Sequence, residues 1–148
     1  MSLQQQVTEQ LKVAMKAKDS VALESLRAIK SAILLAQTQS GAKELTSDDE
    51  IKLVQKLVKQ RKDSASIFRQ QGREDLAEPE EAQIKIIEQF LPEQLDEAAI
   101  TEIIDGIISQ TQASGMKDMG KVMGIASKQM AGKADGKTIS SIVRQKLA

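Results

Sequence analysis

Glycine and lysine are concentrated near the C-terminus in a pattern that suits contact with phosphate groups. Two short segments, DMGKVMG at 118–124 and AGKADGKTIS at 131–140, carry most of them. A glycine lets a second backbone approach closely, and a lysine supplies a mobile positive charge. We therefore expect a surface for a phosphate-rich partner here, rather than a pocket for chemistry. The glycines are Gly120, Gly124, Gly132 and Gly136, and the lysines are Lys117, Lys121, Lys128, Lys133 and Lys137.

The segment from Ala131 to Thr138 is close to a phosphate-binding P-loop but departs from it. Ala131 stands where that motif needs glycine, and a helical pattern rather than a strand comes before it. No apolar strand ending in aspartate supplies a second magnesium ligand either, so nucleotide hydrolysis is not predicted. Local chemistry explains the residues better: Gly132 ends one helix, Asp135 and Gly136 form a tight turn, and Thr138 caps the next helix. The amides at that helix start remain a place for one phosphate group.

Gly120 and Gly124 lie one turn apart within a single short helix. On a helical wheel they fall beside the apolar face, and Lys121 and Lys128 lie just beyond them. Each interior glycine costs about 1 kcal/mol of helix stability relative to alanine, so two of them need a reason. One reason is close packing against a neighbouring helix. The other is docking of a nucleic-acid backbone, with the lysines on its phosphates.

The composition excludes several classes of site. The chain has no histidine and no cysteine, so it cannot build a Ser-His-Asp triad, a Cys-His dyad, a Cys/His zinc site or a disulfide by itself. Its only aromatic residues are Phe68 and Phe90, too few for a base-stacking platform. The acidic stretch 74–81 lacks the ligand spacing of a calcium-binding loop. We therefore predict no catalytic residue, no metal site and no cofactor.

The N-terminal segment MSLQQQVTEQLK has no apolar core of a signal peptide. The longest aliphatic run, Ala32 to Ala36, is much shorter than a membrane span. These features predict a soluble, cytoplasmic protein with no membrane partner.

Charged residues are sorted along the chain although the net charge is zero. Residues 1–73 hold 13 basic and 8 acidic side chains, which gives +5. Residues 74–105 hold one basic and 11 acidic side chains, which gives −10, and residues 116–148 hold 7 basic and 2 acidic ones, which gives +5. Blocks of this length are informative about binding partners rather than about the fold.

Apolar residues recur at three- and four-residue steps along the N-terminal part, which predicts helices. Asp19 is placed to cap the second helix, and Ser47 with Glu50 form a capping box for the third. Arg61 interrupts the apolar stripe of that third helix, and we expect its stem to pack while its head meets a carboxylate. Pro79 is expected at the first position of the fourth helix.

Helical periodicity continues to the C-terminus, and no alternating strand pattern occurs. Pro92 ends the fourth helix, because the residue before a proline avoids the helical region. Asp96 is expected to cap a long fifth helix and Asp118 a short sixth one. The sequence therefore predicts an all-α protein with an N-terminal helical domain, 1–92, and a small C-terminal three-helix domain, 93–148.

Several segments together resemble the GatB/YqeY family. The resemblance covers essentially the whole chain in the right order, in the segments AMKAKD (14–19), LRAIKSAI (26–33), KQRKDSA (59–65), GREDLAEPEE (72–81), FLPEQL (90–95), DMGKVMG (118–124) and GKADGK (132–137). The family includes small stand-alone proteins and the C-terminal tail of GatB, a component of glutamyl/aspartyl-tRNA amidotransferase. It implies a helical domain joined to a small three-helix domain. The tail helps to hold the tRNA, which implies a tRNA-facing segment from Lys117 to Lys146.

GatB has a large catalytic domain ahead of its tail, and nothing of that domain is found in this sequence. We therefore expect a non-catalytic module that binds tRNA or other structured RNA, beside tRNA-charging or amidotransferase enzymes. Only the resemblance connects it with carbon–nitrogen ligases that use glutamine as amide donor. The expected RNA-binding residues are Lys117, Gly120, Lys121, Gly124, Lys128, Lys133, Gly136, Lys137, Arg144 and Lys146.

Two other functions stay open at this stage. The first is a protein-interaction adaptor whose acidic segment 74–105 meets a basic partner or the basic ends of this chain. The second is an amidotransferase accessory that is active only in a complex.

Overall fold

The computed structural model describes residues 2–39, 41 and 44–148, and these residues form helices, turns and loops without any strand. The all-α fold predicted from the sequence is therefore confirmed for the described residues. The chain divides into two compact units, Met1–Leu91 and Pro92–Ala148. Each unit has its own buried aliphatic cluster. That each unit folds as an independent domain stays a prediction.

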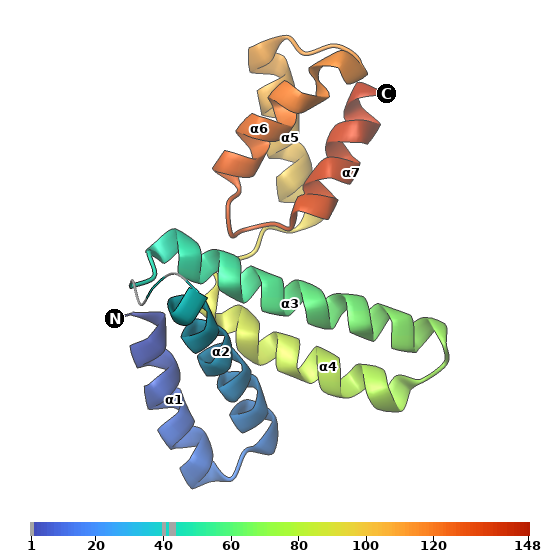
Figure 1. Cartoon of the computed structure of the whole chain (residues 1–148). Coiled ribbons are helices and arrows are strands. Elements are labelled where there is room, and N and C mark those ends of the chain that lie inside the picture. Colours follow the sequence, from blue (N-terminus) through green and yellow to red (C-terminus); the bar gives the residue numbers. More distant parts are fainter. Residues whose placement is uncertain (1, 40, 42–43) are drawn as a thin grey trace. The chain divides into compact units, whose positions relative to one another are not determined.

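Helices α1 (Leu3–Ala17) and α2 (Ser20–Gln39) form the first hairpin of the first unit (Figure 1). The hairpin turns at Lys18, which has a φ of 55°. The Asp19 carboxylate accepts a hydrogen bond from the Ala22 amide at 3.0 Å, so the predicted cap of α2 is confirmed.

Helix α3 (Ser47–Gln70) begins with a capping box formed by Thr46 and Asp49, each bonding the backbone amide of the other at 3.1 Å. The prediction of Ser47 and Glu50 was wrong by one residue, because both pairs have the same spacing. Glu50 has a different role: its carboxylate accepts from the Leu3 amide at 2.6 Å. It thus binds a backbone amide in the first turn of α1 that has no partner within the helix, where a negative charge is favourable.

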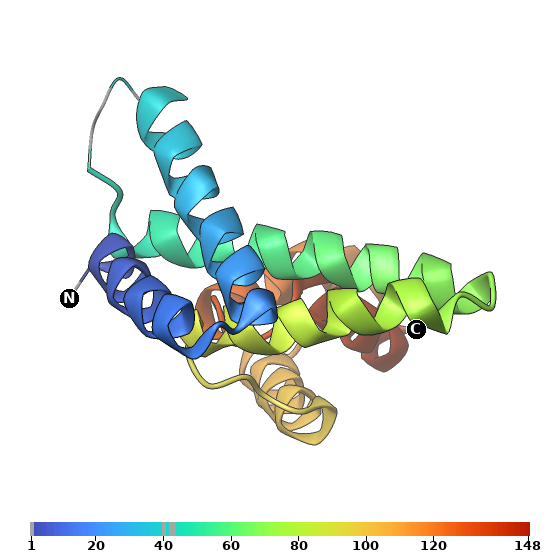
Figure 2. The same ribbon diagram turned by 90° about the horizontal axis from the view of Figure 1, so that it is seen from below.

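Helix α4 (Glu74–Ile87) returns alongside α3, and the two run side by side in both ribbon views (Figure 2). Gly72, with a φ of +73°, makes the turn between them. Pro79 lies inside α4 rather than at its first position, so that prediction was wrong. The helix starts earlier because Glu74 and Asp75 suit its positive end, and the proline then forfeits one backbone hydrogen bond.

The core of the first unit is aliphatic. Its buried members are Leu3, Val7, Leu11, Ala14, Leu26, Ile29, Ile33, Val54, Val58, Ile84 and Ile87. Arg61 is half-buried on α3, but its head does not meet the carboxylate that the sequence predicted. Its Nε donates to Gln83 Oε1 at 2.9 Å, and its Nη1 donates to the Leu57 carbonyl oxygen at 3.1 Å. Neutral oxygens of an amide and a backbone carbonyl, rather than a carboxylate, therefore accept the hydrogen bonds of this arginine.

A short 3₁₀ turn, η1 (Glu88–Phe90), ends the first unit. The second unit contains α5 (Glu97–Thr111), a second 3₁₀ turn, η2 (Met116–Asp118), and the helices α6 (Met119–Gln129) and α7 (Gly136–Leu147). The three helices pack around one cluster (Figure 1). Its buried members are Ile100, Ile104, Ile107, Val122, Ala126, Met130, Ala134, Ile139, Ile142, Val143 and Leu147.

Of the three predicted caps in this unit, Asp96 is confirmed, Asp118 is the N-cap residue of α6 but its side chain bonds no amide of that helix, and Thr138 was wrong. Asp96 accepts from the Ala99 amide at 2.8 Å, as predicted for α5. The Asp118 carboxylate instead accepts from the Ser114 amide at 2.8 Å, so it fixes the turn before α6. Asp135, rather than Thr138, caps α7 by accepting from the Thr138 amide at 2.6 Å. Aspartate is the stronger N-cap of the two, and its use starts the helix earlier.

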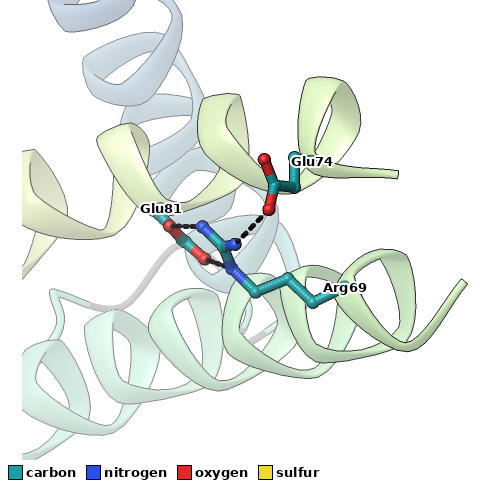
Figure 3. Close-up of polar contacts among 3 residues, drawn as sticks. All are labelled: Arg69, Glu74 and Glu81. Carbon is teal, nitrogen blue, oxygen red and sulfur yellow. Dashed lines mark hydrogen bonds and ion pairs between the residues drawn. The ribbon is translucent and has the colours of Figure 1, made fainter. Parts of the chain in front are cut away.

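Ionic contacts join the outer ends of α3 and α4. The Arg69 guanidinium makes two parallel hydrogen bonds to Glu81, with Nη2 2.8 Å from Oε2, and Glu74 lies 3.8 Å from Nη1 (Figure 3). The hydrogen bonds from Arg69 lower the pKa of Glu81 below its usual 4.5. A carboxylate with a lowered pKa in the folded state adds stability above its usual pKa, and that stability is lost as the pH falls through the lowered value.

We expect a double-mutant cycle of Arg69→Met and Glu81→Gln to give a favourable coupling free energy at pH 7. Because Glu81 must be ionised to attract the guanidinium, the coupling should vanish once the pH is well below 4.5. Urea unfolding of the wild-type protein, the two single variants and the double variant, at pH 7 and at the acid pH, measures this coupling free energy. A coupling that is equal at neutral and acid pH would show that packing, rather than charge, joins these side chains.

Candidate nucleic-acid interface

All ten residues predicted to bind RNA lie in the second unit, and all ten are exposed. Four of them, Gly120, Lys121, Gly124 and Lys128, share the solvent face of α6. Val122, Ala126 and Met130 are buried on its other side, as the wheel predicted. The periodicity of α6 thus places glycines and lysines on one outward strip, which we call the α6 strip.

The two glycines of the α6 strip face open space. A Cβ atom built on Gly120 or on Gly124 meets no atom of its surroundings within 4 Å. Of the two reasons for these glycines, close packing against a neighbouring helix is therefore wrong for the described residues of this chain. The backbone of α6 is bare along this strip, and nothing in the described structure uses it.

The basic side chains of this unit differ in whether they have an acidic partner. Within the described part of the chain, no carboxylate lies within 4.0 Å of the charged groups of Lys117, Lys121, Lys128, Lys133, Lys137 or Arg144. Lys146 is the exception, with its Nζ 3.2 Å from Asp105 Oδ1 on α5. Six cations are thus available to a ligand, whereas the seventh already has a partner.

The unpaired cations come from several places in the unit. Lys117 lies in η2, just before α6. Lys133 lies in the loop between α6 and α7. Lys137 and Arg144 are seven residues apart on α7, so they fall on one face of that helix. Lys146 projects from another side of α7, where it meets α5.

Acidic and basic side chains of the second unit are separated by element. Residues 92–105, which lead into and form most of α5, hold five acids and no base. Residues 116–148, which form η2, α6 and α7, hold seven bases and two acids. A polyanion is therefore attracted to α6 and α7 and repelled by α5.

The start of α7 is less suited to a phosphate than the sequence indicated. The amide of Thr138 is already taken by the Asp135 carboxylate. That carboxylate also brings a negative charge to the place where the phosphate would sit. Gly136 opens α7 and is exposed, and a Cβ atom there would meet nothing within 4 Å. Gly132 lies beyond the end of α6, two residues past the cap Met130.

Sequence reasoning missed one residue beside the basic loop. Gln94 donates through Nε2 to the Gly132 carbonyl oxygen at 2.7 Å, and the Leu95 amide donates to the Lys133 carbonyl oxygen at 2.8 Å. No local pattern signals a contact between positions so far apart in the chain. Both segments nevertheless belong to the stretches that carry the family resemblance, FLPEQL and GKADGK.

Other kinds of site are not found among the described residues. No group of three acidic side chains there is placed to hold a metal ion. No helix of the described structure is long and apolar enough to cross a membrane. A shallow groove of about 760 Å³ lies in the first unit, between α3 and α4 beside Arg69. None of the predicted RNA-binding residues lines it.

Comparison with known proteins identifies the family of this chain. A family model described as Yqey-like protein matches residues 4–147. The chain belongs to the YqeY-like family. It is 32% identical over 139 residues to altered inheritance of mitochondria protein 41, mitochondrial, of Pyrenophora tritici-repentis, which covers 91% of this chain and 75% of that one. The relative of the same name from Kluyveromyces lactis is 33% identical over 138 residues, covering 88% and 68%.

A second kind of relative is GatE, a component of the glutamyl-tRNA(Gln) amidotransferase of Thermococcus gammatolerans. It is 31% identical over 105 residues, which is 68% of this chain but only 17% of that protein. The resemblance to the GatB/YqeY family is thereby confirmed. This chain is related to the C-terminal region of GatB and GatE. The activity of the whole amidotransferase does not follow from so short a match.

The predicted cytoplasmic location is overturned by these comparisons. Four relatives that match this chain are named as mitochondrial proteins. The sequence argument excluded only an apolar signal peptide and a membrane span. Mitochondrial targeting segments are amphipathic rather than apolar, so that argument could not distinguish the two compartments.

Replacing Gly120 and Gly124 with alanine should stabilise the protein, by about 1 kcal/mol for each glycine. Alanine is the better helix former, and its methyl group finds open space at both positions. Urea unfolding measures the change. Gly106→Ala is the matched control, because Gly106 lies inside α5 with equally open surroundings. A loss of stability in the α6 variants alone would mean that these glycines are already packed against something.

Proposed function

We propose that this YqeY-like protein is a non-catalytic module that binds tRNA or another structured RNA through α6, α7 and the loop between them. One observation carries the proposal: six basic side chains without an acidic partner in the described structure lie on η2, α6, the following loop and α7, and two of them flank a bare strip of α6 backbone. The lysines contact phosphates, and the missing side chains at Gly120 and Gly124 let the RNA backbone come close.

The surroundings of the α6 strip favour binding over catalysis. The residues that usually transfer protons near neutral pH or attack as nucleophiles, histidine and cysteine, are absent from the chain. The acids of α5 orient the polyanion toward α6 and α7 by repulsion. The name of the Thermococcus relative adds support, since that amidotransferase is named for glutamyl-tRNA(Gln).

Binding of bulk tRNA should weaken steeply as salt is added, because each phosphate contact releases counterions. We expect a slope of log affinity against log salt of about −0.7 per contact on single strands and nearer −0.9 on duplex RNA if it behaves like B-DNA. In the double variant Lys121→Glu plus Lys137→Glu, the affinity for tRNA should fall roughly tenfold or more. The slope of log affinity against log salt should become smaller in magnitude by about 1.5. Filter binding at a series of salt concentrations measures both.

Two controls make this experiment specific to the surface. Lys56→Glu plus Lys59→Glu makes the same change in net charge on exposed positions of α3, and it should leave the slope unchanged. Gly120→Ala plus Gly124→Ala should weaken binding even though it stabilises α6, whereas Gly106→Ala should not. The proposal fails if tRNA does not bind at low salt, or if both lysine pairs have equal effects.

The adaptor function is less well supported, because the acidic segment 74–105 has partners inside the chain. Every ion pair of the described residues takes its acid from this segment. The pairs are Lys62–Glu88 at 3.4 Å, Arg69–Glu74 at 3.8 Å, Arg69–Glu81, Arg73–Asp75 at 2.9 Å and Lys146–Asp105 at 3.2 Å. These contacts use part of the negative charge that an external basic partner would need.

The accessory function is favoured by one observation, the similarity to GatE. If this protein presents tRNA to a separate amidotransferase, its addition should speed the amidation of Glu-tRNA several-fold when tRNA is limiting. The Lys121→Glu plus Lys137→Glu variant should not do so. An amidation rate that is unchanged by the wild-type protein under limiting tRNA would exclude this role.

A further inference from the structure

Gln94 joins the beginning of the second unit to the loop between α6 and α7. Its Nε2 donates to the carbonyl oxygens of Gly132 at 2.7 Å and Pro92 at 2.8 Å, so both hydrogens of the amide are used. The Leu95 amide donates to the Lys133 carbonyl oxygen at 2.8 Å. Two consecutive residues of one segment thus hold two consecutive carbonyls of another, 38 positions further along the chain.

These two donors add to the hydrogen bonds that the loop makes by itself. Its own bonds run from the amides of Lys133 and Ala134 to the Met130 carbonyl oxygen, at 2.9 and 3.3 Å. The carbonyls of Gly132 and Lys133 take no part in a helix, and in the described structure only Gln94 and Leu95 donate to them. Gly132 is buried and the hydrogen bond that its carbonyl oxygen accepts from Gln94 is partly buried, so the loss of this donor has a cost.

The position of this loop determines where the backbone of two residues with unpaired cationic side chains lies. Lys133 is part of the loop, and Lys137 lies in the first turn of α7, directly after it. A loop that is already held in one shape loses less freedom when it binds a partner. The same loop left free would have to be ordered by the partner, and two phosphate contacts would become weaker.

We propose that Gln94 is a positioning residue for RNA binding: its amide holds the α6–α7 loop so that Lys133 and Lys137 reach phosphates together. The proposal rests on the proposed function and adds a residue that itself touches no RNA. It also makes the segment Pro92–Leu95, by which the chain enters the second unit, a structural part of the RNA-binding surface.

The test is Gln94→Met, which keeps the length and neutrality of the side chain but removes both donors. In the free protein, residue-resolved amide hydrogen exchange should become about fivefold faster at Leu95, Lys133 and Ala134, the change expected for one hydrogen bond of ordinary strength. Exchange at Ile104, in the middle of α5, should not change and so reports that the unit is folded. The affinity for tRNA should fall by a similar factor, and the salt slope should become smaller by about 0.7 to 0.9.

Gln145→Met is the matched control, because Gln145 is an exposed glutamine of α7 without a partner in the described structure. It should change neither exchange nor binding. The inference alone is overturned if wild-type protein binds tRNA and Gln94→Met binds it with the same affinity and slope. Unchanged exchange at the three loop amides overturns it as well. If wild-type protein does not bind tRNA at all, the proposed function and this role of Gln94 both fail.

Discussion

Burial of one aliphatic stripe on each helix is the interaction on which the rest of this structure depends. The chain has two phenylalanines and no tryptophan, tyrosine or cysteine, so it forms no disulfide, and Phe90 is the one aromatic ring that packs against either cluster in the described residues. Residues such as Ile29 and Ile87 in one unit, and Ile104 and Val143 in the other, are almost fully buried instead. Each such side chain contributes roughly 1.5–3 kcal/mol, and a small unit needs most of its helix faces for this purpose.

The periodicity of this aliphatic stripe is what made the fold predictable. It located the helices, the core side of α6 and the caps at Asp19 and Asp96, because all of these depend on residues within a few positions. The errors at the other caps are local as well. Neighbouring serine, threonine and aspartate side chains compete for the same amides. The sequence alone does not decide between Thr46 and Ser47 as the cap of α3, or between Asp135 and Thr138 as the cap of α7.

Contacts between distant segments were beyond sequence reasoning. Glu50 was predicted to belong to its own helix cap, although its carboxylate binds the first turn of α1. Lys146 was grouped with the other lysines, although Asp105 on α5 pairs with it. In each case the side chain has an obvious local role and a different partner in space. The exposed glycines and lysines of α6 could be placed in advance because one helix determines their position, whereas their RNA-binding role remains a proposal.

The separation of charge inside the second unit has a consequence for the rate of encounter. The unit holds seven basic and seven acidic side chains, so it has no net charge. Beyond a Debye length of about 8 Å, such a body feels little pull toward a polyanion and gains no steering of its diffusion. At closer range the acidic residues 92–105 and the basic α6 and α7 experience opposite forces, which rotate the unit. Electrostatics would then select the orientation of the encounter and add little to its speed.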